Sequence, residues 1–499
     1  MGVPCHAQVL VVGGGPVGML VAAELAGRGV DTLVLEREAA TSERPKATTL
    51  HARTAQCLAR RGYLFGPRRR ASGDAVTMPF HFAGMTGLSI TAPAAEPDPI
   101  IKVAQVEVER LFEARALAAG ARVLRGRRVT DVQAAREGVR VVATATGGRE
   151  TFTADYLVGA DGARSTVREQ AGFVSDTHPA TVSAIMGVVR LGDRDAVREG
   201  WHRTPRGWIV AKDGPDGTTH LRTLICDRPP ADRRLPPTVE EFSREASRIA
   251  ARHVGMSAPR WLSRFSDFTR LVRAYRADRV FLAGDAAHVH FPIGGQGLST
   301  GLLDALNLGW KLALAVRGRA GEGLLDTYDS ERRPAAQRVI DNTRAQVALM
   351  RPDPVLDPVR TLLGGMLTSE GVNDCLSAMI SGQETVIAPF AEHSSPWDGT
   401  FLPNAVLSTP QGPTGVTELL QEGRPLLLVQ GDQGSGYARE ARGWSDVLRV
   451  VHCVPTGALP CAALLVRPDG YIGWASDGGT MDTALTAYFG GARRIAPAV

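Results

Sequence analysis

The sequence predicts an α/β protein built from several domains, and three observations lead to this prediction. The chain has 499 residues, which at about 150 residues per domain corresponds to roughly three domains. An apolar run at residues 8–12 ends at a cluster of glycines and is followed by a helix-like stretch and a second apolar run, as in a βαβ unit. Residues 175–275 contain β-rich stretches that alternate polar and apolar side chains, which predicts an antiparallel sheet.

The elements of the first predicted domain follow in order. Residues 8–12 form a strand that is buried on both faces, residues 16–27 form a helix, and residues 30–36 form the next strand and end in an acid. A second helix is expected at residues 106–119. Residues 139–145 and 151–155 are predicted to form meander strands, followed by the apolar segment 156–160.

The buried-strand pattern returns at residues 279–284, and a long helix follows with apolar side chains near helical spacing at Leu298, Leu302, Leu306 and Trp310. The last hundred residues show another α/β pattern. The predicted domains are residues 1–175 with 276–350 (the first domain, from which 70–105 contribute to the second), 176–275 (the sheet domain), 351–400 (a linker with short helices) and 401–499 (the C-terminal domain).

Composition excludes several classes of protein. Hydrophobic residues make up 44% of the chain and charged residues 22%, as in soluble globular proteins. The net charge is only +5, and the longest basic run is Arg68–Arg70, so no nucleic-acid partner is expected. We interpret this run as a solvated loop; the alternative is that it attracts the phosphates of a nucleotide. No run of 18 uncharged apolar residues occurs, so no membrane span is expected.

The cysteines and lysines suggest where the protein works. The six cysteines form no CxxC pair and no metal-ligand cluster, which predicts a reduced, cytoplasmic protein without a metal site. No secretory signal is evident at the N-terminus. Only four basic residues are lysines, and this arginine bias is typical of GC-rich bacterial genomes.

The glycine cluster has the spacing of a dinucleotide-binding turn, Gly13-x-Gly15-x-x-Gly18, with Pro16 and Val17 inside it. The spacing alone is a weak signal, but here it joins a strand to a helix, and Glu36 ends the next strand. The first glycine permits a tight turn, the second lets a pyrophosphate approach the backbone, and the third lets helix and strand pack closely. Glu36 can accept hydrogen bonds from ribose hydroxyls. The pattern does not distinguish FAD from NAD.

Three further segments, together with the glycine turn, carry a resemblance to a known family. They are Gln105-Val-Glu-Val-Glu109, Val158-Gly-Ala-Asp161-Gly-Ala-Arg164-Ser-Thr-Val-Arg168, and Ala283-Gly-Asp285-Ala-Ala-His288 continuing through Pro292-Ile-Gly-Gly-Gln-Gly297 to Leu312. The chain resembles the class A flavoprotein aromatic hydroxylases, and most closely the bacterial hydroxylases of angucycline-, anthracycline- and tetracycline-type polyketides. The resemblance implies an FAD-binding Rossmann-like domain, an antiparallel substrate sheet and, from Arg467 to Trp474, a thioredoxin-like C-terminal domain.

The resemblance also implies roles for single residues. Glu36 and Arg37 bind the adenosine, Val129 offers backbone to the adenine, and Gln105 contacts the ribityl or pyrophosphate portion. Asp285 binds a ribityl hydroxyl, Pro292 and Gly294–Gly297 surround the isoalloxazine ring, and Asp161 with Arg164 belongs to a segment used for both FAD and NAD(P)H. The complete set of expected cofactor residues is Gly13, Gly15, Pro16, Val17, Gly18, Glu36, Arg37, Lys46, Arg53, Gln105, Val129, Asp161, Gly284, Asp285, Pro292, Gly295, Gln296, Gly297 and Leu298.

No residue is assigned as a catalytic base. Pro292 and Gly295 are expected beside the flavin, and His288, His290 and Arg53 are the nearest candidates, for which we favour structural roles. Two positions depart from the family pattern. Lys46 stands where relatives usually carry Arg and lacks its planar fork, and Ser299 replaces the usual Asn.

The expected activity is that of an FAD-dependent monooxygenase, a monomer or homodimer, which consumes NADPH or NADH and O₂ and hydroxylates a phenol-like small molecule through a flavin C4a-hydroperoxide. A Baeyer–Villiger oxygenase on the same scaffold and a flavin-binding protein without hydroxylase activity remain alternatives. A flavin halogenase is disfavoured because no two tryptophans lie two residues apart. A disulfide reductase is disfavoured because Cys57 has no partner cysteine near it in the sequence.

Overall fold

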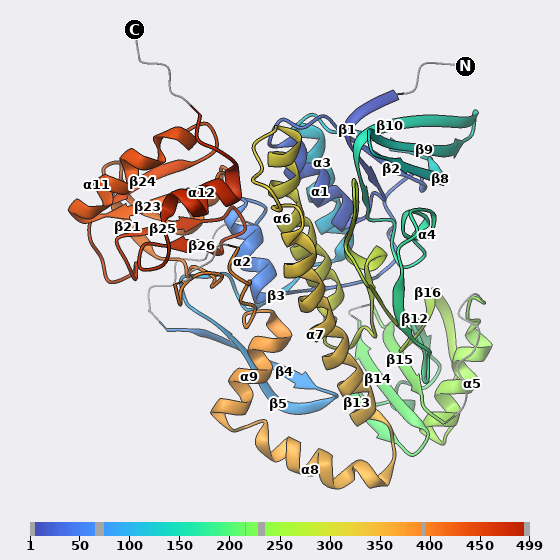
Figure 1. Ribbon diagram of the computed structural model, residues 1–499. Coiled ribbons are helices and arrows are strands. Elements are labelled where there is room, and N and C mark those ends of the chain that lie inside the picture. The colour runs from blue at the N-terminus through green and yellow to red at the C-terminus, as the bar shows by residue number, and fades with distance from the viewer. Residues whose placement is uncertain (1–4, 65–73, 215, 228–234, 391–394, 494–499) are drawn as a thin grey trace.

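A large central sheet organises the first domain of the computed structural model, which describes residues 5–64, 74–214, 216–227, 235–390 and 395–493 (Figure 1). Its strand order is β18-β19-β10-β1-β2-β7, and β9 and β8 continue from β10. The neighbouring strands from β19 to β7 are parallel. The eight strands are β1 (Cys5–Val12), β2 (Thr32–Glu36), β7 (Arg122–Arg125), β8 (Arg128–Ala135), β9 (Gly138–Ala145), β10 (Gly148–Gly159), β18 (Arg276–Ala277) and β19 (Val280–Leu282).

Strand β10 differs from the expectation of a short meander strand followed by a separate apolar segment. It is one strand of 12 residues. Its first half pairs antiparallel with β9 from Gly148 to Ala154, and its second half pairs parallel with β1 from Phe152 to Gly159. Both halves are extended and partly apolar, so the sequence gives no boundary between them, and only the change of pairing partner distinguishes them.

Helices α1 (Pro16–Ala26) and α6 (Gln296–Val316), which lie far apart in the sequence, pack against each other. Two glycines of α6 permit this contact. A Cβ atom on Gly301 would lie 2.8 Å from the Val17 side chain, and one on Gly309 would lie 2.6 Å from Glu24 Cβ. Helix α3 (Gln105–Ala118) also packs on α1, and α7 (Thr327–Met350) runs beside α6 (Figure 1).

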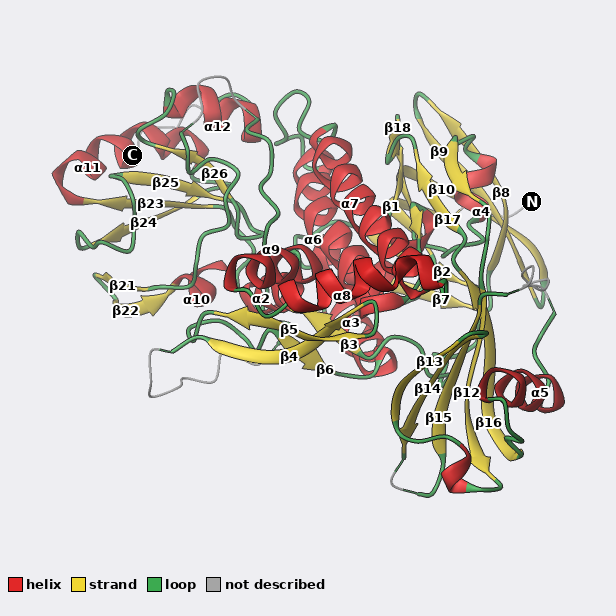
Figure 2. Cartoon of the chain, turned by 90° about the horizontal axis from the view of Figure 1, so that it is seen from below, coloured by secondary structure: helices red, strands yellow, loops and turns green. Residues whose placement is uncertain are grey.

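A five-stranded antiparallel sheet forms the second domain (Figure 2). It is the sheet that the resemblance assigns to the substrate, and it is here called the substrate sheet. Helix α5 (Val239–Ala250) covers one face through Phe242, Ala246 and Ile249. The opposite face, here called the inner face, packs on the hairpin β4 (Val76–Phe82)–β5 (Met85–Ala92) and on residues 291–293. The sheet order is β13 (Gly200–Thr204), β14 (Gly207–Asp213), β15 (Thr219–Ile225), β12 (Ser183–Leu191) and β16 (Met256–Ser266).

The C-terminal domain has a four-stranded sheet of order β24-β23-β25-β26, in which β23 and β24 are parallel and the others antiparallel. The strands are β23 (Leu426–Gln430), β24 (Arg449–Cys453), β25 (Ala463–Val466) and β26 (Ile472–Ala475), and the helices are α10 (Val416–Leu420), α11 (Gly431–Glu440) and α12 (Met481–Phe489). This arrangement matches the thioredoxin-like pattern expected from the sequence.

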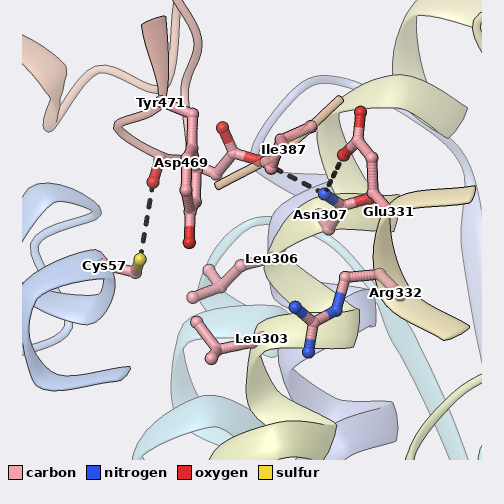
Figure 3. Close-up of a pocket in the computed structure, with 9 residues that line it drawn as sticks. All are labelled: Cys57, Leu303, Leu306, Asn307, Glu331, Arg332, Ile387, Asp469 and Tyr471. Atoms are coloured by element: carbon pink, nitrogen blue, oxygen red, sulfur yellow. Dashed lines mark hydrogen bonds between the residues drawn. The ribbon is translucent and has the colours of Figure 1, made fainter. Parts of the chain in front are cut away.

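A buried ion network joins this domain to α6 and α7. Both terminal nitrogens of Arg467 donate to the Glu331 carboxylate at 2.8 Å, and Lys311 Nζ donates to the same carboxylate at 2.7 Å. A small cavity lies beside the network, between Cys57, Leu303 and Tyr471 (Figure 3). It has about 10 Å³ of space for water, which is room for roughly one molecule.

The remaining elements connect these layers. They are β3 (Thr49–His51), α2 (Ala52–Arg60), β6 (Ile100–Lys102), α4 (Thr166–Gln170), β11 (Ser175–His178), β17 (Thr269–Val272), β20 (His288–Val289), α8 (Asp357–Met366), α9 (Glu370–Ser381), β21 (Val406–Thr409), β22 (Gly412–Gly415) and the 3₁₀ helices η1 (Arg194–Ala196), η2 (Gly284–Ala286), η3 (Ile293–Gly295), η4 (Pro354–Leu356) and η5 (Ala441–Trp444). Within the described ranges, no helix is long and apolar enough to cross a membrane.

Candidate active site

The glycine turn lies at the carboxyl edge of the central sheet, where β1 ends and α1 begins. Gly13 has a φ of +108°, and a Cβ atom there would lie 2.3 Å from the carbonyl oxygen of Ala160. A Cβ atom on Gly18 would lie 1.9 Å from the carbonyl oxygen of Gly13. Gly15 differs, because a Cβ atom there meets nothing within 4 Å. Packing therefore requires Gly13 and Gly18, whereas Gly15 faces open space at the N-terminus of α1.

Glu36 ends β2 at the same edge. Its carboxylate accepts hydrogen bonds from the backbone N–H of Gly14 at 2.5 Å and of Glu38 at 2.8 Å. A carboxylate has about four acceptor sites, so capacity remains for ribose hydroxyls. The Arg127 N–H donates to the Glu36 carbonyl at 2.8 Å, which brings the start of β8 and the buried Val129 close to this carboxylate. The exposed Arg37 side chain is ion-paired with Glu38.

The segment that begins at Asp161 follows β10 at this edge. The Asp161 carboxylate accepts from Ser165 Oγ at 2.5 Å and from the Val167 N–H at 3.1 Å, so its acceptors already shape the loop that begins α4. Burial raises the pKa of Asp161. Arg168 donates to the carbonyl of Ala286 at 3.0 Å and thereby ties this loop to the segment after β19. Arg164 is exposed.

The segment after β19 is held by Asp304 of α6. Asp304 Oδ2 accepts from the Gly284 N–H at 3.1 Å and bonds His288 Nε2 at 2.8 Å. Gly284 has a φ of +61°, and a Cβ atom there would lie 3.0 Å from the Val17 side chain of α1. His288 is buried in this contact, so its role is to position the segment, as expected from the sequence.

Asp285 presents a carboxylate at this position. The side chain is solvent-exposed, and it has no hydrogen-bond or ion-pair partner among the residues that the structure describes. Burial nevertheless raises its pKa, and the charges of His288 and Lys46 oppose the rise. A side chain that is accessible to solvent yet enclosed by protein lies in an open recess. Gln105, at the start of α3, donates its N–H to the Ala47 carbonyl and so holds the Lys46 segment nearby.

The loop between β20 and α6 contains two glycines in left-handed conformation, Gly294 (φ +73°) and Gly295 (φ +67°). His51 Nε2 bonds the Gly294 carbonyl at 2.7 Å, and the backbone N–H of His51 donates to Ser299 Oγ at 3.1 Å. Burial lowers the pKa of His51 to about 4, so a neutral imidazole donates to this carbonyl. Sequence reasoning missed His51, because no motif marks it. Ser299, noted as a departure, has a defined contact here.

Two buried polar atoms at this loop have no hydrogen-bond partner among the residues placed by the structure: Gln296 Nε2 and His290 Nε2. His290 Nδ1 lies 2.8 Å from the Phe291 carbonyl, so Nδ1 carries the proton and Nε2 is left as an acceptor. A Cβ atom on Gly297 would lie 3.3 Å from His290 Nε2. Buried polar groups are normally paired, so a donor and an acceptor at this loop indicate a polar ligand edge.

These features fit FAD. Parallel strands end together at one edge of a sheet, which is where ligands of such sheets bind. This edge offers open backbone at Gly15, acceptor capacity at Glu36 and a free carboxylate at Asp285. The loop with the exposed Pro292 and the half-buried Leu298 continues from it, through Gly295 to the start of α6. Among the described residues, no group of three or more metal-ligating side chains occurs.

The structure places Arg53 between α2 and the segment before the C-terminal domain. Its side chain is buried, and Nη2 donates to the Gln383 carbonyl at 2.8 Å while Nη1 donates to Gln56 Oε1 at 2.9 Å. The guanidinium lies 3.7 Å from the centre of the Phe401 ring. Arg53 therefore joins α2 to the segment before the C-terminal domain, where the carbonyls of Gly382 and Gln383 accept from its guanidinium.

Comparison with known proteins identifies the parts of the chain. Residues 6–343 match the family described as FAD binding domain, and residues 395–492 match the family described as aromatic-ring hydroxylase, C-terminal. The chain is 37% identical to a rifampicin monooxygenase of Streptomyces venezuelae, over 97% of this chain and 99% of that protein. It is 36% identical to an anhydrotetracycline monooxygenase of Streptomyces rimosus (97% and 99%) and to a dialkyldecalin synthase of Streptomyces rugosporus (97% and 98%).

Solved structures agree over the full length. An aromatic hydroxylase from angucycline biosynthesis superposes with a TM-score of 0.88 at 35% identity, covering 98% of this chain and 100% of that one. The anhydrotetracycline hydroxylase from Streptomyces rimosus gives 0.86 at 34% identity, with the same coverage. A Diels-Alderase from pyrroindomycin biosynthesis gives 0.81 at 34% identity, covering 97% and 99%.

Proposed function

The chain belongs to the FAD-binding aromatic-ring hydroxylase family, and from this premise we propose that it hydroxylates a polycyclic phenol of the aromatic-polyketide type, with NADPH or NADH as reductant and O₂ as co-substrate. The observation that carries the proposal is the free Asp285 carboxylate at the carboxyl edge, held in place by Asp304 and His288 and continued by the Gly294–Gly297 loop. We further propose that the enzyme works in the bacterial cytoplasm.

Bound FAD supplies the chemistry that activates oxygen for transfer to a ring. The protein supplies binding and orientation. Gly15 admits the pyrophosphate to the α1 N-terminus, whose free N–H groups favour anions. Asp285 accepts a hydrogen bond from a ribityl hydroxyl. The N-terminus of α6 begins at Gln296, directly after Gly294 and Gly295, and its positive dipole end would stabilise negative charge there by about 0.3–2 kcal/mol.

The inner face of the substrate sheet supports the proposal for an aromatic substrate. Rings connect the Gly294–Gly297 segment, here called the flavin loop, to this sheet. His51 contacts Phe80, with ring centroids 5.6 Å apart, and Phe80 stacks on His81 at 4.9 Å. His81 in turn contacts Trp201 of β13 at 4.6 Å. Such a surface stacks planar substrates and limits the access of water, which oxygen-transfer chemistry requires.

The test uses purified holoprotein and a panel of polycyclic phenols. We expect a yellow protein whose NAD(P)H oxidation is faster in the presence of a substrate, and a product that is heavier by one oxygen atom. A colourless protein that cannot be loaded with FAD would contradict the proposal. Coloured protein that releases only H₂O₂ with every phenol would contradict the hydroxylase assignment. An ester or lactone product of the same mass gain would identify Baeyer–Villiger chemistry instead.

A second candidate is a flavin-binding enzyme that transfers no oxygen. The observation that favours it is the similarity to the dialkyldecalin synthase and to the Diels-Alderase, both over nearly the full chain. A cycloaddition leaves the mass of the substrate unchanged and consumes no NAD(P)H. The same mass-spectrometric experiment therefore separates the two functions, because an isomer formed without NAD(P)H would support the second candidate.

A further inference from the structure

One row of side chains crosses the inner face of the substrate sheet. The pairing register aligns Trp201 of β13 with Val210 of β14, Val210 with Arg222 of β15, and Arg222 with Met186 of β12. Directly paired residues point to the same face of a sheet, whereas their neighbours in sequence point to the other face. Leu221 is such a neighbour and packs under α5, so Arg222 belongs to the inner face.

The next row adds two more basic side chains. Lys212 pairs with His220, and His220 lies two residues before Arg222 on the same strand, so all three share the inner face. The Arg222 side chain is solvent-exposed, yet burial lowers its pKa. As at Asp285, exposure to solvent together with a pKa shifted by burial indicates a side chain in an open recess.

Lys102 reaches the same region from the opposite side. It ends β6, and its Nζ donates to Thr49 Oγ1 at 3.0 Å. Thr49 touches the flavin loop, because a Cβ atom on Gly295 would lie 3.4 Å from Thr49 Cβ. After burial, the charges of Lys212 and Arg222 are the largest causes that lower the pKa of Lys102. Two of the chain's four lysines thus stand with Arg222 between the flavin loop and the substrate sheet.

These charges lack counterions among the residues that the structure places. Within the described part of the chain, Lys102, Lys212 and Arg222 have no carboxylate within ion-pair distance. Burial and the charges of Arg222 and Lys212 lower the pKa of His220, and the Asp216 carboxylate, which opposes this, is ion-paired with Arg260. His81, which contacts Trp201, adds no charge, because burial with Lys102 and Arg222 lowers its pKa to about 4. Three like charges held together without a counterion repel one another, so the arrangement is completed by an anion.

We propose that the substrate binds as an anion, with a carboxylate or an ionised phenol on Arg222 between Lys102 and Lys212, and with its rings against Trp201 and His81. This inference rests on the proposed function, which it narrows to acidic polycyclic aromatics. The planar fork of Arg222 matches two neighbouring oxygens. We assign the cations to the substrate and not to the phosphates of the reductant, because they share one face with Trp201 and Met186.

The test measures binding to FAD-loaded protein by the change in the flavin spectrum. The first probe pair is rhein, an anthraquinone carboxylic acid, and its uncharged carboxamide. We expect wild-type protein to bind the acid at least about tenfold more tightly than the amide at neutral pH, and Arg222→Met to abolish this preference. Arg222→Lys should retain part of it, and Lys212→Met should reduce it.

The second probe is alizarin, a dihydroxyanthraquinone whose phenolate absorbs at longer wavelength than its neutral form. We expect bound alizarin to ionise at least about one pH unit below free alizarin, and this shift to vanish in Arg222→Met. Because His220, His81, Lys102 and Lys212 also face Arg222, each pH series includes the variant. If only the preference for rhein over its amide is found, the group bound at Arg222 is a carboxylate. If only the lowered pKa of bound alizarin is found, that group is a phenolate.

Arg203→Met is the matched control. Arg203 lies on the same sheet, paired with Trp208 of the inner face, but it is ion-paired with Asp357 at 2.8 Å, so its loss should leave both readouts unchanged.

Equal affinity for acid and amide together with no alizarin shift would overturn the inference. If neutral phenols are still hydroxylated, the proposed function stands. A rise in KM for NAD(P)H in Arg222→Met without these binding changes would also overturn the inference and assign the cations to the reductant.

Discussion

Asp304 and His288 share a hydrogen bond of 2.8 Å between Oδ2 and Nε2, and this contact fixes the segment that presents Asp285. Burial alone would raise the pKa of Asp304, but His288 and Arg332 lower it, so the carboxylate is ionised when it holds the Gly284 N–H and His288. The neighbouring Asp285 makes no hydrogen bond or ion pair within the described part of the chain, so Asp304 has the structural role and the Asp285 carboxylate stays available.

Asp285→Ala should fold normally and retain little flavin. The side chain makes no contact that the fold uses, but its removal deprives a ribityl hydroxyl of its acceptor, at a cost of about 1–3 kcal/mol or roughly 5- to 150-fold in affinity. The ratio of flavin to protein absorbance after gel filtration measures the loss. Asp482→Ala, an exposed aspartate of α12, is the control. Unchanged flavin content in Asp285→Ala would exclude this carboxylate from the cofactor site.

Gly15→Ala and Gly13→Ala should fail in different ways. A methyl group at Gly15 meets no protein atom within 4 Å, and the residue has no positive φ, so Gly15→Ala should melt like the wild type. It should bind FAD at least about tenfold more weakly, because the methyl group occupies the approach of the pyrophosphate. At Gly13 the methyl group collides with the Ala160 carbonyl, so this variant should misfold or aggregate. Circular dichroism and flavin titration separate the two outcomes. Full FAD affinity in Gly15→Ala would place the pyrophosphate elsewhere.

Stability should decrease in mild acid through His51. Its pKa is about 4 in the folded protein and about 6.5 for an unperturbed histidine, so the unfolded chain takes up a proton first. The stabilisation is complete above pH 6.5 and is lost as the pH falls from 6.5 through 4; at about 1.4 kcal/mol per unit it amounts to about 3 kcal/mol. Measured by urea unfolding, the free energy of unfolding of His51→Gln should fall by about 3 kcal/mol less than that of the wild type between pH 7.5 and pH 4. His452→Gln, at an exposed histidine, should behave like the wild type.

Arg467→Met should destabilise the contact between the C-terminal domain and helices α6 and α7. It leaves Asp469 without its closest partner and Glu331 with only Lys311 as a cation, so we expect a loss of about 3–5 kcal/mol. Thermal unfolding followed by tryptophan fluorescence measures this loss. Arg449→Met, which breaks only the exposed ion pair with Glu422, should change stability by less than about 1 kcal/mol. Equal effects of the two substitutions would contradict the structural role of the network.

Features governed by local chemistry were predictable from the sequence. The turn at Gly13–Gly18 demands glycine at fixed spacing, and the start of α6 follows directly from the Gly-Gln-Gly segment, so both lie where expected. Contacts made by long-range pairing were not predictable. His51 reaches the flavin loop across 243 positions of sequence, and no local pattern marks such a partner.

The basic side chains of the substrate sheet are a further example. Arg222 looks like any other exposed arginine in the sequence, and only the pairing register shows which face it shares with Trp201. Arg53 is a similar case. It is an expected cofactor residue, and its long-range contacts with the backbone carbonyls of residues 382 and 383 could not be read from the sequence.

The ion network at Glu331 also limits how relatives of this protein can be recombined. A chimera that replaces the C-terminal domain exchanges Arg467 and Asp469 but keeps Glu331, Lys311 and Asn307 from the host. A donor domain without the matching arginine would leave an unbalanced negative charge buried inside the hybrid. Shuffling experiments within this family should therefore move the two halves of the network as one unit. A crossover point between them selects for donor domains that carry an arginine and an aspartate matching Arg467 and Asp469.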